Sequence, residues 1–228
     1  MGQKRTAILY FAYRPDVEAL RKPIFKQHGH EVNVRFYKEL QEELFGQLTP
    51  LGLPVEHIDE RQQHGHGFGE RFCNAIEDVW ARGYDQVIIL GNDTPELDAS
   101  VYQQAYELLR QDKTCLVKTH RNGVALIALQ KERYYRHLWM ELPWQSERIF
   151  DELFDCMAFC KVLGPDAIEL NNLADVFAYL EMHRGKDSIA FLIESILNPL
   201  RNFVSLHLRE KESGFISTRK LRGPPFTC

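Results

Sequence analysis

The sequence lacks the short motifs that identify several large enzyme classes. It contains no GxSxG, Walker A or GxGxxG pattern, which argues against an α/β-hydrolase, a P-loop NTPase and a Rossmann domain. Its five cysteines are sparse and form no CxxC pair, so they favour a reducing compartment over a disulfide framework. Because no run of 18 apolar residues is present and the first apolar run is too short for a signal peptide, we expect a cytoplasmic protein with no transmembrane segment.

The sequence also lacks a large excess of positive or negative charge, although its charged residues are unevenly distributed along the chain. The 228 residues carry a formal net charge of −4, so we expect no binding to nucleic acid. Residues 184–228 hold 8 Lys and Arg against 4 Asp and Glu, which leaves 20 against 28 for residues 1–183. We therefore predict a domain over 1–183 and a basic helical extension over 184–228. The apolar side of that extension favours packing on the domain or homodimerisation over contact with a membrane surface.

Short apolar runs alternate with helical periodicity along the predicted domain. Strands are expected at 7–12, 53–58, 86–90, 114–118, 124–129 and 167–170, and helices at 32–48, 72–83, 97–109, 131–140, 146–162 and 173–180. Residues 13–27 are expected to form an irregular loop. The alternation predicts an α/β three-layer sandwich with a mostly parallel central sheet. Ligands of such sheets bind beyond the carboxyl ends of the strands, here the loops after Ala12, Leu90 and Leu170.

The loop 91–95, with the sequence GNDTP, is the strongest candidate site. Gly91 permits a close turn at the end of the strand, and Asp93 then projects into the ligand crevice. Hard divalent cations such as Mg²⁺ or Mn²⁺ prefer carboxylate and phosphate oxygens together, so Asp93 could hold a metal against a diphosphate. The competing interpretation is that Asp93 or Thr94 only caps the following helix.

A glycine-rich loop over 63–71 is the second candidate. Its glycines could bring backbone close to a ligand, and Arg71 at its end could reach an anion. A plain connection before a helix explains the same composition, because glycine-rich loops are common.

Five segments, taken in order, resemble one known family. They are FAYRP (11–15), GFGERF (67–72), VIILGNDTPELD (87–98), GVALIAL (123–129) and LPWQSERIFDEL (142–153). This series resembles the glycosyltransferase-like family labelled radical-SAM/selenodomain-associated transferase, which has the nucleotide-diphospho-sugar transferase (GT-A) fold. The resemblance covers roughly residues 5–180.

The resemblance implies a pocket for a nucleotide or nucleotide-sugar and transfer of a glycosyl or nucleotidyl group. Residues implied at the nucleotide are Ala12, Arg21, Lys22, Arg71, Gly91 and Asp93. A divalent metal, Mg²⁺ or Mn²⁺, would lie against Asp93 and Asn171, where it would offset phosphate charge.

Three polar positions depart from the family pattern. Glu18 replaces a glycine of a phosphate-gripping segment, although Arg21 and Lys22 keep positive charge nearby. Arg121 replaces a carboxylate and would repel a metal, and Asn171 replaces an Asp but keeps an amide oxygen. Two functions therefore stay open: a metal-dependent glycosyl- or nucleotidyltransferase, and a catalytically degraded GT-A protein that serves as a binding or scaffold module.

Overall fold

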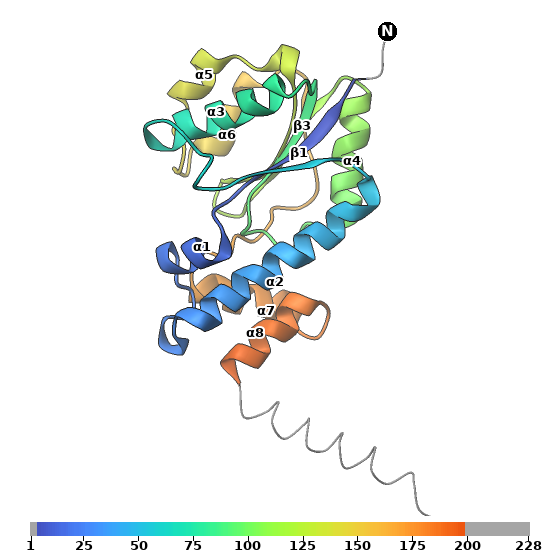
Figure 1. Ribbon diagram of the computed structural model, residues 1–228. Helices are drawn as coiled ribbons and strands as arrows, with labels where there is room; N and C mark the ends of the chain where they lie inside the picture. The colour runs from blue at the N-terminus through green and yellow to red at the C-terminus, as the bar shows by residue number, and fades with distance from the viewer. Residues whose placement is uncertain (1–3, 199–228) are drawn as a thin grey trace, which may run out of the picture.

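Six strands form one mixed sheet that organises the fold (Figure 1). The computed structural model describes residues 4–198. The strands are β1 (Thr6–Phe11), β2 (Val55–Ile58), β3 (Gln86–Leu90), β4 (Thr114–Lys118), β5 (Val124–Gln130) and β6 (Cys160–Val162). They lie in the order β2-β1-β3-β5-β4-β6, and β5 runs antiparallel to its neighbours while the other pairs are parallel. The predicted mostly parallel sheet is therefore confirmed.

Helices cover both faces of this sheet (Figure 1). Helices α3 (Gly67–Ala81), α5 (Arg136–Glu141) and α6 (Ile149–Cys156) bury one face, which includes Leu9 and Ile89. The other face, with Ile8 and Ile88, packs against α4 (Ala99–Arg110) and the end of α2 (His30–Leu48). Neighbouring residues of one strand point to opposite faces, which is why β1 and β3 are apolar after their first residues, Thr6 and Gln86.

A third apolar cluster lies beyond one end of the sheet. It joins α1 (Pro15–Arg21), α2, α7 (Leu173–His183) and α8 (Ser188–Leu197), with Phe36, Tyr179 and Ile193 among its buried members. Helix α8 lies beyond the predicted boundary at 183, and its described residues pack on α2. The boundary itself and homodimerisation stay predictions, and the basic segment after residue 198 lies outside the described residues.

Three local predictions are wrong. Residues 13–27 form α1 and a short 3-10 helix, η1 (Lys26–His28), because Pro15 suits the first turn of a helix and α2 supplies packing. The helix predicted at 146–162 ends at Cys156 and gives way to β6. The strand predicted at 167–170 amounts to one isolated bridge between Thr119 and Ala167.

Candidate functional site

The candidate site lies at the sheet edge where β1 and β3 end. Strand β1 pairs with β2 on one side and β3 on the other, and open α/β sheets bind ligands where the strand order changes direction in this way. The loop 91–98 follows β3, and the loop 163–172 approaches it from β6. The Leu170 amide donates to the Asp93 carbonyl at 2.7 Å, and the Ile168 amide donates to the Glu96 carboxylate. These bonds hold the two loops together.

Lys22 stands at the centre of this edge. Its Nζ lies 3.0 Å from Asn171 Oδ1, 3.4 Å from Asp93 Oδ2 and 3.8 Å from Glu18 Oε1. The Tyr37 hydroxyl donates to the Lys22 carbonyl at 2.7 Å, which fixes the backbone just after α1 ends. The fold thus brings together Lys22, Asp93 and Asn171, three residues that were predicted from distant parts of the sequence.

The cluster around Lys22 carries more negative than positive charge. Burial raises the pKa of Glu18, with a further contribution from Asp93, while Lys22 opposes the shift. Burial likewise raises the pKa of Glu169, and Asp93 again adds to it. Three carboxyl groups therefore lie near one ammonium, and burial is the main reason that the pKa values of Glu18 and Glu169 are raised. Sequence reasoning missed Glu18 and Glu169 as members of the site.

Asp93 has no role at the start of the next helix. The carboxylate of Asp98 caps α4 by accepting from the Ser100 and Val101 amides. The prediction that Asp93 or Thr94 caps this helix is therefore wrong. A Cβ on Gly91 would lie 3.4 Å from Asp93 Oδ1, close to an ordinary contact distance, so the Asp93 carboxylate lies directly beside the Gly91 backbone.

The other predicted nucleotide residues lie in separate settings, and the polar contacts of the Lys22 side chain do not include them. The Ala12 carbonyl is hydrogen-bonded to His57 Nε2 at 3.0 Å. The Arg21 guanidinium lies 4.5 Å from the ring centroid of Tyr13. Arg71 Nε is buried on α3 and has no hydrogen-bond partner within residues 4–198.

Arg121, whose positive charge was expected to repel a metal, is paired with a buried carboxylate. Arg121 forms an ion pair with Asp175, whose side chain is 3% exposed. Asp175 also accepts from the Asn171 and Asn172 amides at 2.9 and 3.1 Å and completes a capping box at α7. Arg121 is therefore part of the support beneath Asn171.

Gly123 gives a first test of how tightly the site is packed. A Cβ there would lie 2.5 Å from Glu169 Oε1 and 2.7 Å from Thr119 Oγ1, so we expect Gly123→Ala to cost about 1–3 kcal/mol of unfolding free energy. Gly46→Ala, at an open position of α2, should instead stabilise by about 0.5–1 kcal/mol. Urea denaturation of both variants checks the opposite signs. Equal changes in unfolding free energy for the two variants would show that the loop around Gly123 accommodates the added methyl group without cost.

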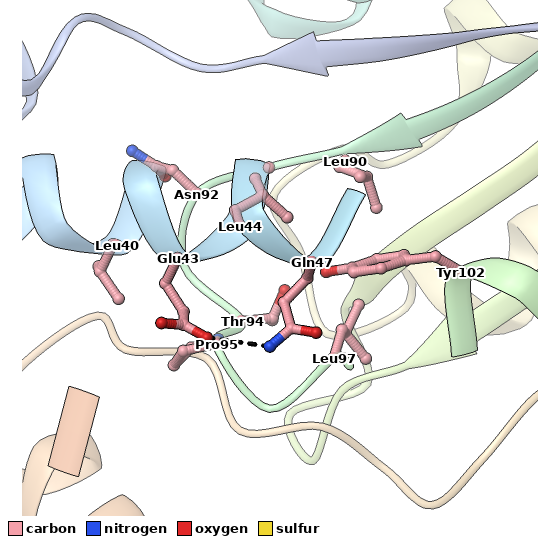
Figure 2. Close-up of a pocket in the computed structure, with 11 residues that line it drawn as sticks. Leu40, Glu43, Leu44, Gln47, Leu90, Asn92, Thr94, Pro95, Leu97 and Tyr102 are labelled. Atoms are coloured by element: carbon pink, nitrogen blue, oxygen red, sulfur yellow. Dashed lines mark hydrogen bonds between the residues drawn. The ribbon is translucent and has the colours of Figure 1, made fainter. Parts of the chain in front are cut away.

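The loop 91–98 also closes a small cavity on the side of α2 (Figure 2). Glu43, Leu44 and Gln47 of α2 face Thr94 and Pro95 across it, and Gln47 donates to Glu43 at 2.9 Å. Its volume of about 20 Å³ holds roughly one water molecule. The cavity therefore does not serve as a nucleotide pocket; it shows that α2 supports the loop from behind.

The oxygen atoms around Lys22 match the chemistry of a divalent-cation site. Mg²⁺ is commonly held by one or two carboxylates together with phosphates and waters, and Asp93 and Asn171 supply a carboxylate and an amide oxygen. The Lys22 ammonium contacts both of these oxygen atoms. No group of three His, Cys, Asp or Glu side chains converges into a metal cluster within residues 4–198.

Comparison with protein families assigns the chain. A family model described as "Uncharacterized protein conserved in bacteria (DUF2064)" matches residues 22–146, which begin at Lys22 and include Asp93. The chain belongs to the DUF2064 family. Comparison with curated proteins gives no significant match. Across the described part of this DUF2064 chain, no helix has the length and hydropathy needed to cross a bilayer.

Solved structures agree on the fold of this DUF2064 protein. A protein from Desulfovibrio desulfuricans G20, provisionally assigned as a nucleotide-diphospho-sugar transferase, superposes with a TM-score of 0.70 at 16% identity, covering 88% of this chain and 99% of that one. A 4-diphosphocytidyl-2C-methyl-D-erythritol synthase from Anaerococcus prevotii DSM 20548 matches more weakly, with a TM-score of 0.44 at 14% identity over 79% and 99% of the two chains. The first match shows the nucleotide-diphospho-sugar transferase-like fold, and the second carries no further argument.

Proposed function

We propose that this protein is a glycosyl- or nucleotidyltransferase that binds a nucleotide or nucleotide-sugar at the carboxyl edge of β1 and β3. The observation that carries the proposal is the convergence of Lys22, Asp93 and Asn171 at the strand ends where ligands of such sheets bind. The fold supports the class of reaction by analogy alone. The narrower assignment to the radical-SAM/selenodomain-associated transferases, and a cytoplasmic location, stay predictions.

Each residue has a distinct part in the proposed site. Lys22 would bind a phosphate oxygen through its ammonium, and Arg71 would offer its guanidinium to a further oxygen of the ligand. Gly91 lets the backbone approach the ligand. Asp93 and Asn171 would hold Mg²⁺ or Mn²⁺. When bound, this ion would neutralise phosphate charge and stabilise the departing group.

A second function is favoured by one position. Arg121 stands where the related family has a carboxylate, and its pairing with Asp175 keeps it there. A chain without that carboxylate could bind nucleotide and lack turnover, acting as a binding or scaffold module. Ligand binding without transfer or hydrolysis of a bound nucleotide-sugar would select this alternative.

Calorimetric titration tests the binding proposal. Nucleoside diphosphates and diphospho-sugars of each base would be titrated into the protein with Mg²⁺, Mn²⁺ or a chelator. We expect binding that depends on the metal and falls by about tenfold or more in Asp93→Ala, because a hydrogen bond or contact to a charged group is worth roughly 1.5–3 kcal/mol. Asp155→Ala, at an exposed position of α6, is the matched control. Absence of binding across the whole panel would refute the proposal.

A further inference from the structure

Lys22 combines a fixed backbone with a side chain that can move. Its carbonyl is held by Tyr37, while its side chain is 21% exposed and has a flexible four-carbon stem. The ammonium at the end of that stem makes its contacts with Glu18, Asp93 and Asn171, which come from three separate segments. A change in Lys22 alone would therefore alter the whole cluster without moving the backbone.

The ammonium and a divalent ion would require the same oxygen atoms. Asp93 Oδ2 and Asn171 Oδ1 both accept from Lys22, so the lone pairs that face the ammonium are engaged. A metal ion bound to the same two oxygen atoms would lie about 4 Å from the Lys22 ammonium. At that separation two positive charges repel each other by well above thermal energy in a protein environment. Occupancy by Lys22 and occupancy by a metal are therefore mutually exclusive.

We infer that Lys22 is a built-in counter-cation that blocks the metal position until its side chain leaves Asp93 and Asn171. The inference rests on the proposed function for the place of the metal, and it adds a means of control. A phosphate group is a strong acceptor that can take over the ammonium, so arrival of the phosphate frees the oxygens that the metal needs. Metal and phosphate are then taken up together, and the empty protein binds little metal.

Titration of Mn²⁺ without any nucleotide, followed by electron paramagnetic resonance of the free ion, tests this inference. Lys22→Met keeps the length of the side chain and removes its charge, so it should bind Mn²⁺ about tenfold or more tightly than the wild-type protein. Lys22→Arg keeps the charge and should bind as weakly as wild type. Lys26→Met, on η1, removes a lysine outside the cluster and should also leave the affinity unchanged.

A second variant locates the gained site. Lys22→Met combined with Asp93→Asn should lose the gain, because the carboxylate that receives the metal is gone. Equal Mn²⁺ affinity in the wild-type and Lys22→Met proteins, or a gain that survives Asp93→Asn, would overturn the inference. If circular dichroism shows Lys22→Met to be unfolded, Lys22→Gln replaces it in the same titration. If the protein binds nucleotide but Lys22→Met gains no Mn²⁺ affinity, the proposed function stands and this inference falls. If Lys22→Met gains Mn²⁺ affinity but the protein binds no nucleotide, this inference stands and the proposed function falls.

Discussion

Replacing Asp175 by alanine should lower the unfolding free energy by about 3 kcal/mol. The carboxylate is buried, pairs with Arg121 and accepts from the Asn171 and Asn172 amides, so its loss leaves two backbone donors without a partner. Each such donor costs roughly 1–3 kcal/mol. The bond from the Asn172 amide is one half of the capping box of α7, and the other half, made by the Asn172 side chain, remains in the variant. The Arg121 side chain is 43% exposed and can be hydrated, which keeps the total near 3 rather than 5 kcal/mol.

Thermal and urea denaturation measure this effect. For a chain of this length, a loss of 3 kcal/mol corresponds to a fall of roughly 6–12 °C in Tm. Asp155→Ala, a carboxylate removed from an exposed position of α6, should change the stability by less than about 0.5 kcal/mol. If both variants lost the same small amount of unfolding free energy, the loop before α7 would be held by contacts other than the hydrogen bonds and ion pair of Asp175.

Replacing Ile193 by alanine should cost about 2–5 kcal/mol, although Ile193 lies beyond the predicted domain. The side chain is fully buried in the cluster formed by α1, α2, α7 and α8. Its truncation removes apolar contact and leaves a cavity between helices. The helix α8 would lose part of its hold on α2, and the whole cluster shares the loss.

Phe191 provides a matched control on the same helix. Its side chain is 56% exposed, so Phe191→Ala should change the unfolding free energy by less than about 1 kcal/mol. The comparison uses urea denaturation followed by far-ultraviolet circular dichroism. A small loss in both variants would mean that α8 unfolds on its own before the sheet does, and that the third cluster is not part of the cooperative core.

The central strands were predictable because their sequences agree with their surroundings. The predictions at 86–90 and 114–118 match β3 and β4 in full, since both strands are short, apolar and bounded by polar residues. Helix α1 was not predicted because only two of its seven residues, Glu18 and Ala19, are buried, and two residues give no helical periodicity. Such a short helix is stable through packing on α2, which sequence periodicity does not reveal.

The end of α6 shows a different limit. The chain leaves the helical pattern through Phe159, which has a φ of 56°, a backbone conformation that is rare for a bulky residue. Because no glycine occurs at this position, the apolar residues up to Val162 led us to predict that the helix continues. The three-residue strand β6 exists because it pairs with β4, a contact between distant segments.

The site was predictable in part. Asp93 followed from its place after a buried strand, and Lys22 and Asn171 from the family resemblance. Glu18 was seen only as a departure from that family and Glu169 was not singled out, because their relation to Asp93 depends on how three loops meet. One signal was available: Glu18 and Lys22 are four residues apart, the spacing of an ion pair on a helix, and the pair forms at 3.8 Å. Using it would have required predicting α1.

The position of α8 on α2 has a consequence for the protein during its synthesis. Helix α2 leaves the ribosome before most of the sheet has been made, whereas α8 follows after all six strands. Until then the side of α2 that carries Phe36 and Leu40 lacks the helix that packs against it. A partly made chain therefore exposes apolar surface for most of its translation, and such surfaces are where nascent chains aggregate or are bound by chaperones.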